Sequence, residues 1–439
     1  MTHKRIHLAA HFPGVNNTTV WSDPESGSQI DFASFKHLAE TAERGTFDFF
    51  FLAEGLRLRE VKGRIHDLDV VGRPESLTVL SALAAVTTHL GLAATVNSTF
   101  NEPYELAKRL ATLDHLSGGR AAWNVVTSWD AFTGENFRRG GYLDKADRYV
   151  RAEESLRLVR KLWDSWSEDD LVLAQAVGVF AREGAGVFTD EGAHFSIHGR
   201  FGLPRSPQGH PVVIQAGDSD QGRDFAAGSA DVIFSRHGAF EAGQTFYKDV
   251  KSRLPRYGRS EDSLKIMPAV TVVVADTDAE AADKARHIRE QQVSGPTAIV
   301  LAELLWGRDL SSYDPDGPLP AEDPVVGSGV TKGRVGYNDP GPIVAEWRAQ
   351  AEAHGWSLRE TVINQQNRQT FIGSPSTIAA AMDRHVQEDA ADGFVLVPHL
   401  TPGGLDDFVD RVVPLLRDRG SFRSEYTGTT LRHHLGLTT

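Results

Sequence analysis

The chain has no cysteine among its 439 residues, which excludes disulfide bonds, thiolate metal sites and cysteine nucleophiles. It also has no run of about 20 apolar residues, the length that spans a bilayer. The first residues, MTHKRIHLAAHFPG, contain no apolar stretch long enough for a signal peptide. We therefore expect a cytoplasmic protein without a membrane partner.

Clusters of basic residues are missing as well. The formal net charge is −13, and no basic or basic-aromatic run offsets it. Because nucleic-acid binding depends on neutralising phosphates, this charge argues against a nucleic-acid partner. Hydrophobic residues make up 40% and charged residues 24%, which is ordinary for a globular protein.

Several catalytic motifs are absent from the sequence. There is no GxSxG elbow, no phosphate-binding P-loop, no HExxH pair and no dinucleotide-binding fingerprint. His3, His7 and His11 are four residues apart, but they have no cysteine or carboxylate partner nearby in the sequence. We therefore predict no metal site. If the chain is an enzyme, a bound cofactor is the natural source of its chemistry.

What the sequence does contain is a regular alternation of apolar runs and helical patterns. Leu106, Leu110 and Leu113, for example, recur at helical spacing before the glycines that follow Ser117. Short apolar runs predict eight strands: 4–10, 47–52, 90–96, 120–126, 211–216, 231–235, 265–275 and 393–398. Eight strand–helix units predict an α/β fold, a (β/α)8 barrel that spans 1–439 as a single domain.

Two stretches break this rhythm and are predicted to be insertions, at about 168–210 and 290–370. The first is rich in glycine and short mixed runs, which favours β structure. Within the second, residues 307–342 are dense in Gly, Pro and Asp and indicate a long loop between the seventh and eighth units. That loop is expected to be either a lid over the barrel mouth or a surface or subunit-contact loop.

Polar residues follow several of the predicted strands. In (β/α)8 barrels the site lies at the carboxyl ends of the strands, so these residues are candidate ligand contacts. The triplet after the fifth strand also starts a helix, where free N–H groups suit a phosphate, although Ser and Asp are common helix caps too. The candidates are Glu54, Thr95, Asn97, Ser98, Asn124, Thr127, Ser128, Gly217, Asp218 and Ser219.

Several longer segments resemble one family. They are FDFFFLAEG (47–55), NSTFNEPYELAKRLATLDHLSGGR (97–120), the continuation AAWNVVTS (121–128), DRYVRAEE (147–154) and SPQGHPVVIQAGDSDQGRDFAA (206–227). Together they resemble the nitrilotriacetate monooxygenase component A family, which includes dibenzothiophene sulfone monooxygenase and belongs to the bacterial luciferase-like superfamily. The resemblance runs through most of the chain and implies the same barrel fold.

The resemblance also implies a function. The chain would be an FMN-dependent monooxygenase, the oxygenase component of a two-component system, using O2 and reduced FMN from a separate NAD(P)H:flavin reductase. Its substrate would be a small organic molecule: a sulfone, thioether, aminopolycarboxylate or haloaromatic. A homodimer or homotetramer is expected. The alternatives are a deazaflavin-dependent dehydrogenase of the same superfamily and a non-catalytic flavin-binding protein.

The resemblance assigns roles to individual residues. Ser219 matches a serine that contacts the flavin phosphate, and Tyr149 matches a tyrosine that hydrogen-bonds the cofactor. Lys145 replaces a frequent histidine, and its ammonium group could pair with the phosphate. Asp218 is expected to turn away and cap the helix. The other strand-end residues, with Glu54 at the polar edge of the ring, are expected against the flavin.

Three residues are candidates for catalysis: His11, His237 and Asn124. His11 lies at the exit of the first strand, and His237 follows the sixth strand in FSRHGAF. Either imidazole could move a proton near neutral pH or hydrogen-bond an oxygen adduct of the flavin. A lone histidine is more often structural, so that alternative stays open.

Overall fold

The computed structural model describes residues 3–16, 18–58, 60–65, 73–128, 136–137, 147–326, 331–332 and 339–437. Its centre is a closed barrel of eight parallel strands in the order β1-β17-β13-β12-β11-β6-β5-β2, which confirms the predicted fold. The strands are β1 (His7–Phe12), β2 (Phe49–Leu52), β5 (Gly91–Asn97), β6 (Ala121–Val126), β11 (Val212–Gln215), β12 (Val232–Ser235), β13 (Lys265–Val270) and β17 (Gly393–Leu396).

The strands are continuous apolar runs because both of their faces are buried. In β2, Phe49 and Phe51 belong to the cluster inside the barrel, whereas Phe50 and Leu52 belong to the cluster under the outer helices. This alternation follows from the two-residue repeat of a strand.

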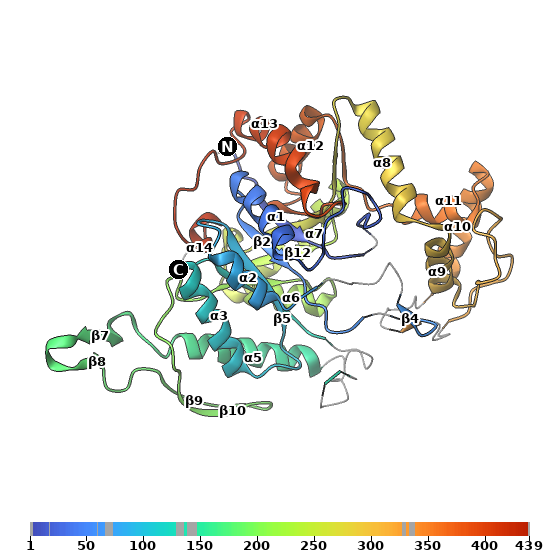
Figure 1. Ribbon diagram of the computed structural model, residues 1–439. Helices are drawn as coiled ribbons and strands as arrows, with labels where there is room; N and C mark the ends of the chain where they lie inside the picture. The colour runs from blue at the N-terminus through green and yellow to red at the C-terminus, as the bar shows by residue number, and fades with distance from the viewer. Residues whose placement is uncertain are drawn as a thin grey trace.

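Helices cover the outside of the barrel (Figure 1). The outer layer contains α1 (Phe32–Arg44), α2 (Ser76–Ala84), α3 (Pro103–Ser117), α5 (Asp147–Trp163), α6 (Asp220–Ser229), α7 (Phe240–Arg253), α8 (Asp278–Gln292) and α12 (Pro375–Gln387). Residue types fix both ends of α3, since Pro103 is tolerated in its first turn and Gly118 is its left-handed C-cap with φ 68°. The sequence pattern of residues 76–88 predicts one helix, but α2 ends at Ala84, because the buried guanidinium of Arg120 takes the Ala84 and Thr87 carbonyls.

The first predicted insertion forms two antiparallel hairpins. They are β7 (Leu171–Ala174) with β8 (Val179–Ala181), and β9 (Val187–Glu191) with β10 (Ser196–Arg200). Figure 1 shows the β7–β8 hairpin extending away from the barrel.

The second insertion contains helices that the sequence analysis did not predict. These are α9 (Gly295–Trp306), α10 (Gly341–His354) and α11 (Leu358–Gln365), which lie beside the far end of α8 in Figure 1. They share an apolar cluster in which Trp306 meets Trp347 edge to face at 6.0 Å.

Of the predicted loop over 307–342, residues 307–326 form no helix or strand, but hydrogen bonds fasten them to these helices; residues 327–330 and 333–338 lie outside the described residues, and the last two residues begin α10. Arg348 of α10 donates to the carbonyls of Pro320, Ala321 and Glu322. Farther along, β15 (Thr331–Lys332) pairs with β3 (Glu60–Val61), which pairs with β4 (Arg64–Ile65).

The predicted strand over 265–275 is two strands. After β13 the chain leaves the barrel, and β14 (Val272–Val274) pairs with β16 (Phe371–Gly373). This parallel pair brings the start and the end of the second insertion together.

The C-terminal part also differs from expectation. The sequence pattern of residues 404–417 predicts one helix, but the structure has a 3-10 turn (Gly403–Leu405), a π-helix (Phe408–Val412) and α13 (Val413–Asp418). The segment after it, of uncertain order from sequence, is structured through residue 437 and contains α14 (Leu431–His434).

This last segment closes the barrel at the amino ends of its strands. Leu431 and Leu435 join the cluster inside the barrel. The Leu431 amide donates to the carbonyl of Gly119, just before β6, and the Arg432 guanidinium pairs with Asp231, just before β12, at 2.9 Å. Among the described helices, none is both long and apolar enough to cross a membrane.

Candidate active site

The predicted polar residues lie along one half of the barrel mouth. Strands β2, β5, β6 and β11 are consecutive neighbours in the barrel, so their carboxyl ends form one arc. Along this arc follow Glu54 after β2, Thr95 and Asn97 in β5, Asn124 in β6 and the Gly217–Ser219 turn after β11.

The first contact of the arc joins Glu54 to Asn97. The backbone N–H of Asn97 donates to the Glu54 carboxylate at 3.2 Å, and its side-chain amide donates to both carboxylate oxygens at 3.1 Å. Burial raises the pKa of Glu54 to about 7, with a smaller contribution from the charge of Glu75, although the Asn97 bonds oppose the shift. Glu54 can therefore hold or release a proton near neutral pH. The Asn97 amide oxygen accepts from the Phe100 N–H, so its side chain positions Glu54.

The second contact joins Asn124 to Thr95. The Asn124 amide donates to the Thr95 hydroxyl at 3.0 Å. The amide oxygen of Asn124 is buried and accepts no hydrogen bond from the described residues. A buried acceptor without a partner costs roughly 1–3 kcal/mol, so this oxygen suits a ligand that carries an N–H or O–H group.

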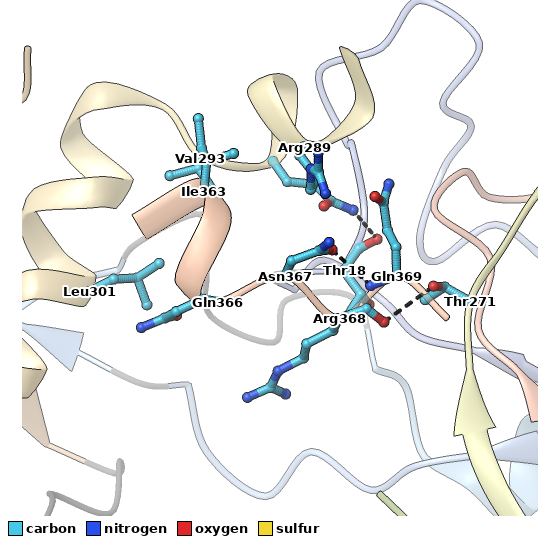
Figure 2. Close-up of a pocket in the computed structure, with 11 residues that line it drawn as sticks. Thr18, Thr271, Arg289, Val293, Leu301, Ile363, Gln366, Asn367, Arg368 and Gln369 are labelled. Atoms are coloured by element: carbon cyan, nitrogen blue, oxygen red, sulfur yellow. Dashed lines mark hydrogen bonds between the residues drawn. The ribbon is translucent and has the colours of Figure 1, made fainter. Parts of the chain in front are cut away.

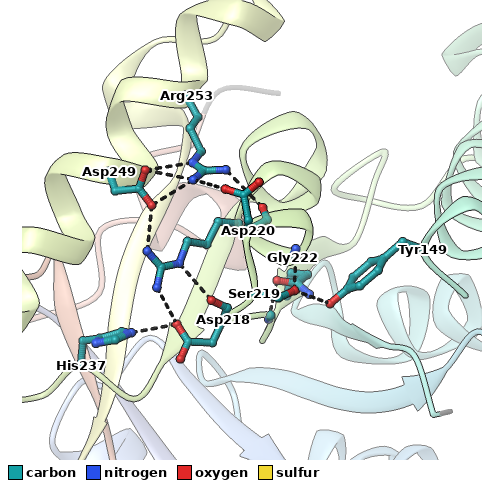
Figure 3. A network of polar contacts seen from close by, with 11 residues as sticks. Tyr149, Asp218, Ser219, Asp220, Gly222, His237, Asp249 and Arg253 are labelled. Carbon is teal, nitrogen blue, oxygen red and sulfur yellow. Dashed lines mark hydrogen bonds and ion pairs between the residues drawn. The ribbon is translucent and has the colours of Figure 1, made fainter. Parts of the chain in front are cut away.

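The arc ends at the amino terminus of α6, shown in Figure 3. Ser219 is the N-cap, and its hydroxyl accepts from the Gly222 N–H at 3.1 Å. The Tyr149 hydroxyl lies 3.3 Å from the Ser219 hydroxyl. A Cβ atom on Gly217 or Gly222 would lie 2.7 or 2.8 Å from the Cα of the other, so both positions require glycine. Two hydroxyls thus flank a helix start without bulky side chains, a suitable seat for a phosphate.

Asp218 turns away from this seat, as predicted, but the predicted cap role was wrong because Ser219 caps the helix. The Asp218 carboxylate pairs with His237 at 2.8 Å and with Arg223 at 3.1 Å, and Arg223 also pairs with Asp249 at 2.9 Å (Figure 3). Partial burial acts to raise the pKa of Asp218, but the bonds and charges of His237 and Arg223 leave it below its ordinary value.

The two candidate histidines have different surroundings. His237 stacks on Phe246 with ring centroids 4.5 Å apart and is held by Asp218. His11 is buried in β1, where its Nδ1 lies 3.0 Å from the Phe51 carbonyl and donates to it. Burial, and then the charge of Arg73, lower the pKa of His11 to about 3, although the Phe51 bond opposes this. His11 therefore stays neutral near pH 7 and cannot supply a proton there. Its Nε2 can only accept a hydrogen bond.

The remaining predicted contacts are less defined. Ser98 is buried and donates to the Val126 carbonyl at 3.4 Å. Thr127 and Ser128 are half-buried just after β6. Lys145 lies outside the described residues.

The other half of the mouth holds a cavity that the sequence analysis missed. Its volume is about 580 Å³, and it lies over the carboxyl ends of β12, β13 and β17. Phe234, Ala269, Val270 and Val397 provide apolar walls, Arg236 stands directly after β12, and residues 367–370 return from the second insertion to close one side. A signal was present in the sequence, since Arg236 follows a predicted strand, but residues 367–370 become neighbours only through the fold.

Fold and site together define a class: a (β/α)8 enzyme whose polar arc has one buried acceptor without a partner and ends at a phosphate seat, beside a substrate-sized cavity, an arrangement that fits a phosphate-bearing cofactor. Comparison with known families agrees. Residues 14–393 match the luciferase-like monooxygenase family, and the chain belongs to it.

Individual relatives match over nearly the whole chain. The chain is 39% identical to the N-acetyl-S-(2-succino)cysteine monooxygenase of Bacillus subtilis (99% of this chain, 97% of that protein). It is 38% identical to nitrilotriacetate monooxygenase component A of Aminobacter aminovorans (95% and 92%). Among solved structures, a riboflavin lyase with modified FMN and riboflavin superposes with a TM-score of 0.80 at 30% identity, covering 99% of this chain and 97% of that one.

These relatives confirm the predicted family and the predicted activity, that of a flavin-dependent monooxygenase. A coenzyme F420-dependent alcohol dehydrogenase superposes with a TM-score of 0.58 at 15% identity, covering 94% of this chain and 100% of that one. At that identity the likeness shows the shared barrel alone.

Proposed function

We propose that the flavin is FMN, that it arrives in reduced form from a separate NAD(P)H:flavin reductase, and that with O2 it oxidises a small organic substrate. One observation carries this proposal: the polar arc from Glu54 to Ser219 ends at a phosphate seat and includes a buried acceptor without a partner, Asn124. When bound, the reduced flavin supplies the activation of oxygen, and the chain binds, orients and shields the reactants.

The residues present fit FMN. The hydroxyls of Ser219 and Tyr149 and the free N–H groups at the start of α6 would hold the terminal phosphate. Asn124 and Glu54 lie farther along the arc, where the polar edge of the ring would meet an acceptor and a carboxyl group. FMN is favoured over FAD because the described part of the arc offers one phosphate seat.

A separate reductase is supported by the sequence and by the relatives. The chain has no dinucleotide-binding fingerprint with which to bind NAD(P)H itself. Two relatives are named as parts of larger systems: nitrilotriacetate monooxygenase component A, and one of the subunits of pristinamycin IIA synthase. A reductase that draws on NAD(P)H would also place the system in the cytoplasm.

Oxygen uptake tests this function. Enzymatically supplied reduced FMN should sustain oxygen consumption that a substrate couples to product, and reduced deazaflavin should not. Apoprotein should bind reduced FMN more tightly than reduced FAD. Stable binding of oxidised flavin without coupled oxygen consumption would instead indicate a flavin-binding protein, and tighter binding of FAD would overturn the choice of FMN.

The second insertion is proposed to shield the mouth. Lys62, in the turn between β3 and β4, reaches across to Glu303 and Asp309 of the insertion at 2.6 Å each. This ties the loop after β2 to α9. We expect Lys62→Gln to loosen the tie and raise hydrogen peroxide release per flavin oxidised, without weakening FMN binding. Lys36→Gln, at an exposed pair on α1, is the control. Fully coupled turnover in Lys62→Gln would argue against shielding by this contact.

We propose that the chain forms a homodimer or homotetramer in which the β7–β8 hairpin makes the contact between subunits. It extends from the body (Figure 1) and exposes several large apolar side chains: Leu171, Val172, Leu173, Val177, Val179 and Phe180. Exposed apolar clusters of this kind mark contact surfaces. Val177→Lys combined with Phe180→Lys should shift the chain towards monomer in analytical ultracentrifugation, and an unchanged mass would exclude the hairpin as the contact.

A further inference from the structure

The charged residues around the cavity all have the same sign. Arg236 and Arg368 line the large chamber of about 580 Å³. A neighbouring niche of about 30 Å³, shown in Figure 2, is lined by Arg289 and again by Arg368. No Asp or Glu is among the described residues that line either space. The chain as a whole has a net charge of −13, so the positive charge of these two spaces is opposite in sign to that of the protein.

Arg289 has no counter-charge in its niche. Its Nε is buried and has no hydrogen-bond partner among the described residues. Of the neighbouring amides, Gln292 donates to the Thr18 carbonyl at 2.7 Å and Gln369 donates to the Ala285 carbonyl at 2.9 Å, while the buried amide oxygen of Gln369 has no hydrogen-bond partner among the described residues. Burial, with the charge of Arg286 adding to it, lowers the pKa of Arg289, while Glu290 opposes the shift. A half-buried guanidinium without a partner is costly unless a ligand supplies the negative charge.

Arg236 is the second cation without a partner. It is exposed at the end of β12 and forms no ion pair within the described part of the chain. The walls next to it are apolar, with Phe234 and Val397 among them.

The segment that both spaces share is fixed in place. The Thr271 hydroxyl accepts from the Thr370 N–H at 3.1 Å and donates to the Arg368 carbonyl at 3.3 Å. The chamber and the niche are thus adjoining parts of one site. The chamber has the apolar wall and Arg236, and the niche has Arg289.

We propose that this site binds a small organic carboxylate as the substrate, an inference that rests on the proposed function. Its carboxylate groups meet Arg236 and Arg289, and its apolar part lies against Phe234 and Val397 in the chamber. A water molecule needs roughly 10–15 Å³, so the niche has the size of one carboxylate group. Guanidinium and carboxylate groups match in geometry as well as in charge. A neutral substrate would leave both cations unpaired, which selects against it.

Titration calorimetry on the full chain at low ionic strength tests this. The probe is N-acetyl-S-(2-succino)cysteine, a thioether with three carboxylates, and its matched neutral form is the trimethyl ester. The acid should bind and the ester should not. Arg289→Gln and Arg236→Gln should each weaken binding of the acid about tenfold to a hundredfold, the size of a charge-assisted hydrogen bond. Arg286→Gln is the control, since Arg286 lies on the same helix but pairs with Asp283 outside the site.

The outcomes separate clearly. Equal binding of acid and ester, no binding of the acid, or an equal loss in Arg286→Gln would each overturn the carboxylate site. Arg236 is exposed, so its variant should fold even if Arg289→Gln is destabilised, and thermal melting checks both. Anaerobic binding of reduced FMN by the apoprotein tests the proposed function independently. If reduced FMN does not bind, the function is wrong. If it binds and the ester is oxidised in preference to the acid, only the substrate class is wrong.

Discussion

Replacing Glu54 with Gln should change how the stability of the protein depends on pH. Glu54 has a folded-state pKa of about 7 against an ordinary value of 4.5, because it is buried. Between these two values the folded state holds a proton that the unfolded state has released. Stability from this proton is therefore fully present below pH 4.5 and is lost as the pH rises through 7. At about 1.4 kcal/mol per pH unit, the loss is roughly 3 kcal/mol by pH 8.

The Glu54→Gln variant has no ionisable group at this position, and the new amide oxygen can still accept from Asn97. Relative to the wild type, the variant should thus gain roughly 3 kcal/mol in free energy of unfolding between pH 4.5 and pH 8. Any constant effect of the changed hydrogen bonds cancels in this comparison, which makes the pH dependence more informative than the stability at one pH.

Urea unfolding of both proteins across pH 4.5–8, followed by circular dichroism, measures the difference. Glu25→Gln, at an exposed carboxyl, controls for the loss of one surface charge. Two parallel stability curves for wild type and Glu54→Gln would refute the reasoning, because the buried carboxyl would then ionise as it does in the unfolded chain.

Three further changes test other parts of the structure. Ser219→Ala should weaken binding of reduced FMN by about 1–2 kcal/mol and, because a helix cap is lost, also lower the free energy of unfolding by about 1 kcal/mol. The control Ser357→Ala removes the N-cap of α11 and should lower only the free energy of unfolding. If the two variants bind reduced FMN equally well, Ser219 acts only as a cap. Arg432→Gln removes the ion pair with the buried Asp231 carboxylate at the closed end of the barrel, while the charges of Arg160 and Arg259 remain near it, so unfolding by denaturant should show a loss of about 3 kcal/mol while FMN affinity is unchanged. His11→Gln should leave the shape of the pH–rate profile between pH 6 and 8 unaltered, because the imidazole is neutral throughout that range; a lost inflection would show that His11 titrates there.

The barrel was predictable from sequence because its strands are buried on both faces and separated by clear breaks. Helix ends were correct where a residue type enforces them, as Pro103 and Gly118 do for α3. The segment that forms α9, GPTAIVLAELLW, was missed because it is apolar on almost every side and has little helical periodicity. It is helical because α10 and α11 cover it, which is a tertiary effect.

The candidate site was predictable only in part, for a similar reason. Strand order makes neighbours of Asn124 and Thr95, so polar residues at strand ends were sound candidates. The cations of the cavity come from the end of β12 and from α8 and residue 368, which flank the inserted helices. No local pattern brings Arg236 and Arg289 together. Equally, Asp218 is occupied by ion pairs with His237 and Arg223, and no local pattern in the sequence brings these three residues together.

Closure of the barrel by residues 431–437 has a consequence for synthesis. The ribosome makes these residues after all eight strands, so a growing chain can pair β1 with β17 before the amino-terminal end of the barrel is closed. Until then the apolar side chains inside the barrel, among them Ala9, Phe49 and Ala93, are open to solvent at that end. Such surfaces attract chaperones and favour aggregation. A chain that ends before Leu431 would keep this apolar surface exposed. Cellular proteases would therefore degrade it, although its cofactor seat was already formed.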